Sequence, residues 1–505
     1  MEDTADDAER RRRRDLLLGT SFTNKDNAKA VKYGRYSVVD LFCGCGGLSA
    51  GLESTGLFQT LIAVDKSPVA LATFAANHHN AKKPPLVIEA DLGRLDASVI
   101  RKKLRRQGIL TGQLDCLVGG PPCEGYSQNK AERSNARSQF HFLALKSHST
   151  RHWDGAEQMA IPRLPNKPAR AHRKDDRNTL FRVILRVAEL CRPKIVLIEN
   201  VPDILTYRNG AVRREIELTL KRLGYFVDIR ILNAADYGVP QLRRRAFIVA
   251  QRKDVHAASM MSAFPGPTHT ASESSGRLKD LRGDHGRHVT VWEAIGDLPL
   301  PRVEKGVRSR PAGHRASAKL SKYRAWAQCD GPVCNHEERP ISQRVLKRVR
   351  AMKPGMRTHE LPSRLRTRKF YYNSYGRLQW DRPANTVTKS CMYLGSGKFA
   401  HPEQDRGLTV REAARLQSFT DGFKFVGSSP KMIANLIGGA VPPLLARAFG
   451  LQIASLLAAC ERRERVRVPR KIGATGYRAA ERRRRTIRPI SAQTPSVSSR
   501  TRHSA

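Results

Sequence analysis

One cysteine of this chain stands in a setting suited to nucleophilic chemistry. Cys123 follows the glycine pair Gly119-Gly120 and two prolines, Pro121 and Pro122. The prolines restrict the backbone just before the thiol, and the glycines open the turn that leads to it. A thiolate held in a rigid loop is a strong nucleophile toward an electron-poor ring carbon. Most lone cysteines are inert core residues, so this assignment depends on the loop and on the groups around it.

Glu199 and two arginines could assist such a nucleophile. Glu199 ends an apolar run, and a carboxyl there could protonate, or hydrogen-bond, a ring nitrogen and make the ring more electrophilic. Arg243 and Arg245 are two residues apart and therefore project from one face of an extended segment. They could hold a carbonyl oxygen or a phosphate. Taken alone, the two arginines would equally suit a solvated basic face.

A glycine-rich turn near the N-terminus predicts a bound cofactor. Asp40 begins the stretch Asp40-Leu41-Phe42-Cys43-Gly44-Cys45-Gly46-Gly47, in which glycines let the backbone approach a ligand closely. Asp65 ends the next apolar run and is the acid expected to take ribose hydroxyls. Nicotinamide, flavin and S-adenosylmethionine sites share both features, and Asp65 alone also suits a surface acid. The turn therefore predicts a nucleotide-like cofactor without choosing among these.

Alternating strands and helices are expected to position these groups. Short apolar runs occur at 37–39, 61–64, 86–88, 114–118, 195–198, 227–232 and 247–250. Such runs suit strands buried on both faces, and helical spacing occupies 67–77 and 179–191 between them. We predict an α/β fold with a doubly wound, mostly parallel sheet. Ligands bind beyond the carboxyl ends of such strands, which is where Asp40, Asp65, Asp91, Cys123 and Glu199 fall. Helix capping explains any one of these acids, but explains all five sites less well.

The charge of the chain predicts a polyanionic partner. The 505 residues exceed what one core usually supports, and 91 Lys+Arg against 46 Asp+Glu give a net charge of +45. Nucleic acid is the first candidate, because neutralising phosphates releases counterions. Part of the excess lies in the runs 10–14 and 482–485, in polar terminal segments that we expect to be disordered.

The cysteines and the apolar runs exclude other classes. Nine cysteines without regular spacing do not predict a secreted disulfide framework. Cys329 and Cys334 would need two more ligands to hold zinc, so no metal is expected. No signal core is seen, and no apolar run approaches the roughly 20 residues that span a bilayer. We expect a soluble, cytoplasmic, nucleoid-associated protein that does not bind membranes.

Taken in order, the motifs resemble those of the DNA (cytosine-5)-methyltransferases over roughly residues 36–460. The cysteine loop and Glu199-Asn200-Val201-Pro202 are together highly specific for that family. The other matching segments are 40–47, Gln241-Leu242-Arg243-Arg244-Arg245, 377–384 with 386–388, 408–417 and Ile437-Gly438-Gly439-Ala440-Val441-Pro442-Pro443.

The resemblance implies a two-lobed, Rossmann-like methyltransferase that flips a cytosine of duplex DNA into its pocket. Cys123 would attack carbon 6 while Glu199 engages ring nitrogen 3, Arg243 and Arg245 would orient the base, and carbon 5 would take the methyl group. By the family pattern, S-adenosylmethionine would be bound by Asp40, Phe42, Gly44, Cys45, Gly47, Asp65, Lys66, Asp91, Leu92, Pro121, Gly439, Ala440 and Val441.

The expected organisation has five segments. Residues 1–34 form a disordered basic arm, 35–250 the catalytic S-adenosylmethionine-binding domain and 251–395 the target-recognition region. Residues 396–462 return to complete the catalytic domain, and 463–505 form a disordered basic tail. The long basic stretch 128–174 is expected to be an insertion or a mobile functional loop. A monomer is expected, sharing its target site with a restriction endonuclease that it does not bind.

The chain departs from the family pattern at three places. Gly439 stands where the family usually has Asn, Asp65 where it usually has Glu, and the loop after Cys123 is longer than usual.

Three competing functions stay open at this point. The same chemistry on transfer RNA would use a similar site with a shorter recognition region. A catalytically idle regulator would bind DNA without transferring a methyl group. A nicotinamide-dependent oxidoreductase would be supported by the glycine turn alone.

Overall fold

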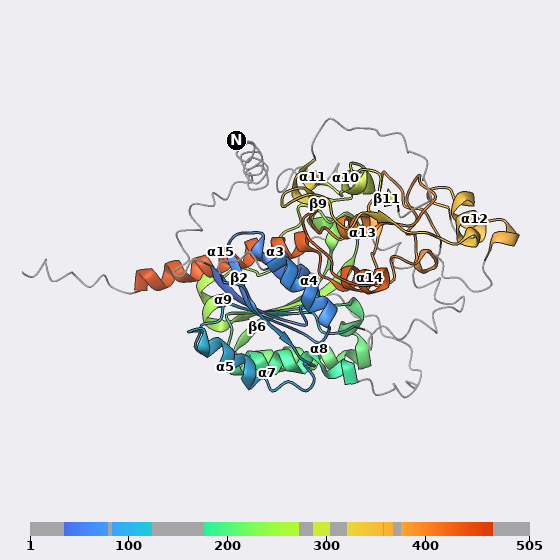
Figure 1. Cartoon of the computed structure of the whole chain (residues 1–505). Coiled ribbons are helices and arrows are strands. Elements are labelled where there is room, and N and C mark those ends of the chain that lie inside the picture. The colour runs from blue at the N-terminus through green and yellow to red at the C-terminus, as the bar shows by residue number, and fades with distance from the viewer. Residues whose placement is uncertain are drawn as a thin grey trace, which may run out of the picture.

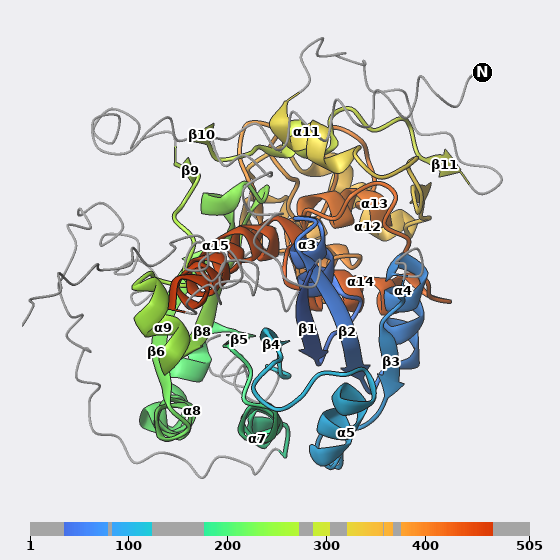
Figure 2. The ribbon, with the colours of Figure 1, turned by 90° about the vertical axis from the view of Figure 1, so that its left-hand side faces the viewer.

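The chain forms two lobes, of which one is built on a twisted β-sheet (Figure 1). The computed structural model describes residues 35–78, 83–123, 176–271, 286–303, 321–356, 358–366 and 375–467. The expected arm 1–34, the stretch 128–174 and the tail from 468 onward lie outside the described residues. The sheet lobe carries helices on both faces, and the second lobe lies beside α4 (Pro68–His78) and above α15 (Pro443–Arg467) (Figures 1 and 2).

The main sheet has seven strands in the order β3-β2-β1-β4-β5-β8-β6. All its pairings are parallel except those of β8, which runs antiparallel to both β5 and β6. The expected α/β class with a mostly parallel sheet is confirmed, and each predicted apolar run lies within or overlaps one of its strands. The strands are β1 (Tyr36–Leu41), β2 (Phe58–Asp65), β3 (Leu86–Glu89), β4 (Cys116–Gly119), β5 (Ile195–Asn200), β6 (Tyr225–Asn233) and β8 (Arg244–Arg252).

Side chains alternate between the two faces of the sheet, which explains the short apolar runs of its central strands. Val39 and Leu41 of β1 join the core under α5 (Ser98–Arg106), α7 (Phe181–Cys191) and α8 (Tyr207–Arg222). Val38 joins the opposite core, with α3 (Gly47–Glu53), α9 (Lys253–Ser259) and α15. Because successive residues of a strand point to opposite faces, both faces must be apolar when helices cover both.

The C-terminal helix α15 returns to the first lobe and packs on α3 and α9. In the described part of the chain, the helical stretch 430–463 is long and apolar enough to cross a membrane. The expectation that no apolar run approaches this length is therefore wrong. However, 61% of its most apolar 18-residue segment is buried inside the protein. Leu445 and Phe449 of this stretch pack in the core of the sheet lobe. This helix belongs to the core.

The second lobe is built from short helices joined by long irregular segments (Figure 1). One apolar cluster includes Val291, Trp326, Val349, Phe399 and Leu416. The helices are α10 (Val291–Ile295), α11 (Lys322–Ala327), α12 (Gln343–Ala351), α13 (Val410–Leu416) and α14 (Pro430–Gly439). Since α13 and α14 share this cluster with residues 289–400, the part of segment 396–462 that packs on the sheet is mainly α15.

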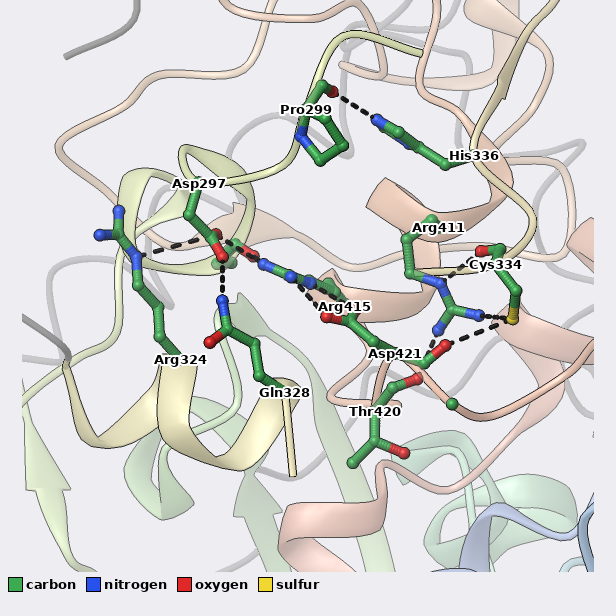
Figure 3. A network of polar contacts seen from close by, with 12 residues as sticks. Asp297, Pro299, Arg324, Gln328, Cys334, His336, Arg411, Arg415, Thr420 and Asp421 are labelled. Carbon is green, nitrogen blue, oxygen red and sulfur yellow. Dashed lines mark hydrogen bonds and ion pairs between the residues drawn. The ribbon is translucent and has the colours of Figure 1, made fainter. Parts of the chain in front are cut away.

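Buried arginines organise the irregular segments of the second lobe (Figure 3). Arg415, 1% exposed, donates to both oxygens of Asp421 at 2.8 and 2.6 Å and to Asp297 at 2.6 Å. Arg411, wholly buried, donates to the carbonyl oxygens of Cys334 and Phe423 at 2.8 and 2.6 Å. Buried backbone carbonyls need such donors, and buried charges need partners. These arginines satisfy groups that regular secondary structure would otherwise satisfy.

Replacement of Arg415 by methionine is expected to lower the free energy of unfolding by about 3–5 kcal/mol, because it leaves buried Asp421 without its counter-charge. Urea titration followed by tryptophan fluorescence measures the change. Arg382→Met is the control, because that side chain is 70% exposed. Equal midpoints for both variants would show that the Arg415 network does not stabilise this lobe.

Candidate active site

The predicted site residues meet at one edge of the sheet because their strands are parallel and in register. Leu41 at the end of β1 pairs with Val64 of β2 and with Gly119 of β4. Gly119 in turn pairs with Ile198 of β5. The glycine turn, the cysteine loop and Glu199 therefore leave the sheet at the same level. Ligands of open parallel sheets bind at this carboxyl edge.

The loop that carries Cys123 is held by the residue after the glutamate. Asn200 is buried, and its Nδ2 donates to the carbonyl oxygen of Pro121 at 3.0 Å. Its Oδ1 accepts from the backbone N–H of Val201 at 2.9 Å, which orients the amide. Cys123 lies half-buried beyond Pro121 and is not in a disulfide. Asn200 therefore ties the cysteine loop to the end of β5.

Glu199 lies beside this loop with one carboxylate oxygen available for a ligand. Arg245 Nε lies 3.2 Å from Glu199 Oε1, and both side chains are largely buried. Despite this ion pair, Oε1 is buried and accepts no hydrogen bond from any described residue. A Cβ built on Gly120 would lie 3.3 Å from Oε2, so the loop passes close to the carboxylate. A buried carboxylate oxygen of this kind is suited to a hydrogen bond from a bound ring nitrogen.

The Arg243 side chain contacts the junction of the two lobes. Its guanidinium donates to the carbonyl oxygens of Val387, Gly438 and Ala440, each at 3.1 Å. Burial, with the charge of Arg245 nearby, lowers the pKa of Arg243 to about 9, so it stays cationic at neutral pH. Glu199 and Cys123 oppose this lowering of the Arg243 pKa, so both lie near enough to act on the guanidinium.

Two glutamines that sequence reasoning did not single out complete this junction. Gln241 is buried, donates to the carbonyl oxygen of Leu416 at 2.7 Å and accepts from the N–H of Val387 at 2.9 Å. Gln417 donates to the carbonyl oxygen of Ala440 at 2.6 Å. The short strands β7 (Gln241–Leu242) and β13 (Ala384–Asn385) pair beside them. Both glutamines lie within motifs that resemble those of the family, and this is the signal by which the sequence could have identified them.

The glycine turn forms a cradle that fits a nucleotide-like ligand. Gly44 and Gly46 have φ of 55° and 91°, left-handed values that glycine adopts without strain. Phe42, with φ of 60°, adopts the same region at a cost in strain. Asp65 Oδ2 accepts from the N–H of Gly44 at 2.9 Å, so this acid also shapes the turn. A Cβ on Gly44 would meet no described atom within 4 Å. The turn therefore presents an open side of its backbone.

The other predicted cofactor residues lie around this turn or beneath it. Asp91 and Lys66 are exposed, and Leu92 and Pro121 are buried. Cys45 is buried, with its thiol directed to the carbonyl oxygen of Leu436. The turn 439–441 lies against the start of α3, because a Cβ on Gly47 would be 2.4 Å from the carbonyl oxygen of Val441. Of these residues, Gly439 is exposed and Ala440 half-buried.

Asp40 lies beneath the turn, buried, with its Oδ2 accepting from Ser49 Oγ at 2.6 Å. Burial raises the pKa of Asp40 to about 7, partly opposed by the Ser49 hydroxyl and reinforced by the charges of Asp65 and Glu53. The carboxyl therefore supports the glycine turn from inside the protein.

This pKa makes stability depend on pH. Between the ordinary value of 3.8 and about 7, the folded state keeps a proton on Asp40 that the unfolded state has released. The free energy of unfolding that Asp40 contributes is therefore fully present below pH 3.8 and is lost as the pH rises through about 7. The loss is at most about 1.4 kcal/mol per pH unit. Asp40→Asn should gain stability relative to the unmodified chain as pH rises from 4 to 7. Urea unfolding at several pH values measures this, and parallel curves would contradict it.

The mixed, mostly parallel seven-stranded sheet matches the fold of a solved DNA methyltransferase structure. The model of the C-5 cytosine-specific DNA methylase family matches residues 36–141 and 168–455. The chain belongs to that family, and it is a DNA cytosine-5 methyltransferase by class. The resemblance seen in the motifs is thereby confirmed.

Named relatives support the same conclusion. Type II methyltransferase M1.HphI of Haemophilus parahaemolyticus is 31% identical over 413 residues, covering 81% of this chain and 84% of the relative. Type II methyltransferase M.AgeI of Thalassovita gelatinovora is 29% identical, covering 81% and 97%. A crystal structure of a prophage-encoded E. coli protein, assigned as a DNA modification methyltransferase, has a TM-score of 0.57 at 21% identity and covers 84% and 99%. This last likeness concerns the fold.

Proposed function

We propose that this enzyme methylates carbon 5 of a flipped-out cytosine in a specific duplex DNA sequence, through a covalent adduct with Cys123. The observation that carries the proposal is the cluster of Cys123, Glu199 and Arg245 at the carboxyl edge of the sheet, in which the buried Glu199 Oε1 lacks a described hydrogen-bond donor. A cytosine ring with a protonated nitrogen 3 would supply that donor. Protonation also makes carbon 6 more electrophilic.

In the proposed reaction the thiolate of Cys123 adds to carbon 6, and the displaced π electrons make carbon 5 nucleophilic. Carbon 5 takes the methyl group, loses its proton to a base, and the sulfur–carbon bond breaks as the ring double bond re-forms. Glu199 holds the proton at nitrogen 3 while the adduct exists. Arg245 keeps the Glu199 carboxylate in place and orients the base. The carbonyl contacts of Arg243 support a positioning role for that residue.

The family uses S-adenosylmethionine, which supplies an electrophilic methyl group when bound. In this chain the open backbone of Gly44 and the Asp65 carboxylate fit its adenosine part. The remaining contacts are proposed to come from Phe42, Cys45, Gly47, Lys66, Asp91, Leu92 and Pro121, and from the turn at Gly439, Ala440 and Val441. Asp40 supports the turn from beneath.

The composition of the second lobe supports a role in DNA recognition, and the named relatives support a biological setting. We propose that residues 251–395 read the target sequence, since base edges and phosphates are contacted by the Arg and Lys residues in which this region is rich. Relatives named as type II methyltransferases support a restriction-modification role. A monomer in the cytoplasm, associated with the nucleoid, suits this role. A restriction endonuclease would share its site without binding the enzyme.

Transfer of labelled methyl groups tests the proposal. The purified protein is incubated with labelled S-adenosylmethionine and either mixed-sequence duplex DNA or transfer RNA. Label at carbon 5 of cytosine in DNA, at a restricted set of sequences, is expected. Label in transfer RNA alone would establish RNA as the substrate, and cofactor and DNA binding without transfer would favour an idle regulator.

A further inference from the structure

The side chain of Lys389 lies beside Gly439, at the start of the turn 439–441. The backbone of Thr388 and Lys389 lies directly on Gly438, where an added Cβ would be 2.2 Å from the carbonyl carbon of Thr388 and 2.3 Å from the nitrogen of Lys389. A Cβ on Gly439 would meet the Cε atom of Lys389 at 3.3 Å. The aliphatic part of the Lys389 side chain therefore occupies the space beside Gly439, and its ammonium group is one bond further on.

This arrangement is fixed from both sides. Arg243 donates to the carbonyl oxygens of Val387 and Gly438 and so holds the Lys389 segment against the turn. The turn 439–441 also contacts the start of α3, because the carbonyl oxygen of Val441 lies beside Gly47. Lys389, which is half-buried, is thus attached to the wall that faces the glycine turn of the proposed cofactor site.

The charges of the two walls differ. The end of β2 provides the acid Asp65, which binds the backbone of the glycine turn. The opposite wall, formed by the turn at Gly439, carries the ammonium group of Lys389. S-Adenosylmethionine has one anionic group, the carboxylate of its amino-acid end, and the Asp65 carboxylate on the strand side would repel it. An ammonium on the opposite wall provides the complementary charge.

We propose that Lys389 binds the carboxylate of the methyl donor, and that its side chain can do so because position 439 has none. The proposal rests on the proposed function, since it names a further contact of the same site. It assigns a binding residue on the segment that leads from the second lobe, so donor binding also depends on the junction held by Arg243.

Calorimetry with two ligands tests the assignment. S-Adenosylhomocysteine has the amino-acid carboxylate, whereas 5′-methylthioadenosine shares the adenosine and the sulfur but lacks that end. Lys389→Met is expected to weaken S-adenosylhomocysteine binding about ten-fold, as loss of a charge-assisted hydrogen bond would, and to leave 5′-methylthioadenosine binding unchanged. Lys389→Arg should retain most of the affinity. Lys431→Met, at an exposed position of α14, is the matched control and should behave as the unmodified chain.

A second variant tests the role of the missing side chain. Gly439→Leu would place a bulky side chain beside Lys389 Cε, where the Cβ alone would already lie 3.3 Å from that atom. It should displace the ammonium and weaken S-adenosylhomocysteine binding in the unmodified chain but not in the Lys389→Met background. Independent effects of the two substitutions would contradict this part of the proposal.

Three results would overturn the assignment. Equal weakening of both ligands by Lys389→Met would show that the lysine only supports the fold. Unchanged S-adenosylhomocysteine binding, with the salt slope of DNA binding reduced by about one, would assign Lys389 to a DNA phosphate instead. Failure of the unmodified chain to bind S-adenosylhomocysteine would overturn the proposed function itself, and with it this contact.

Discussion

Replacement of Cys123 by serine is expected to lower kcat for cytosine methylation by at least about a thousand-fold, because a serine hydroxyl is not ionised where a thiol can be. The substitution changes little else. The loop is held through the carbonyl oxygen of Pro121, which Asn200 binds whatever residue occupies position 123. Binding of S-adenosylhomocysteine and DNA should therefore persist in the variant.

A second cysteine provides the control for this experiment. Cys329 is half-buried in the second lobe, and burial raises the pKa of its thiol to about 12. Cys329→Ser should therefore leave kcat near that of the unmodified chain. Methylation by Cys123→Ser at more than about a tenth of the normal rate would exclude Cys123 as the nucleophile.

Replacement of Glu199 by glutamine is expected to lower kcat by about a hundred- to a thousand-fold, within the range of general acid–base effects. Glutamine has nearly the same shape but cannot carry the proton that activates the ring at nitrogen 3. It also leaves the Arg245 guanidinium without the carboxylate that lies 3.2 Å from it. The loss should therefore fall on kcat more than on DNA affinity.

Single-turnover methylation measures this effect separately from binding. Glu215→Gln is the matched control, because Glu215 forms an exposed ion pair with Arg182 on the helical side of the sheet lobe. Formation of a covalent adduct with normal kinetics by Glu199→Gln would contradict the role given to this carboxylate. A loss of DNA affinity alone would assign Glu199 to substrate binding.

The sheet lobe could be predicted because its elements are defined by local patterns. Central runs such as 195–198 are apolar on both faces, and Val38 and Val39 enter opposite cores as strand geometry requires. The second lobe has no such pattern. Its core depends on pairs such as Arg415 with Asp297, which are 118 positions apart in the sequence. Separations of this kind leave no periodic signal, so the sequence predicted an irregular lobe without its internal order.

The candidate site, too, could be predicted only in part from the sequence. Cys123 and Glu199 could be singled out because each follows an apolar run, and parallel strands bring such residues to one edge. Arg243 and Arg245 share a spacing, but Arg243 binds carbonyl oxygens at the lobe junction whereas Arg245 lies beside Glu199. Backbone carbonyls are present at every residue, so partners of this kind cannot be identified from residue type. The same reason hid the contribution of Asn200.

Covalent trapping tests the central claim most directly. Duplex DNA of mixed sequence containing 5-fluorocytosine is incubated with the enzyme and S-adenosylmethionine, because fluorine at carbon 5 cannot leave as the proton does and the adduct accumulates. Mass spectrometry of the digested complex is expected to find methylated 5-fluorocytosine attached to Cys123, and no adduct with Cys123→Ser. Methylation of unmodified DNA without a trapped adduct, or an adduct at another cysteine, would contradict the account.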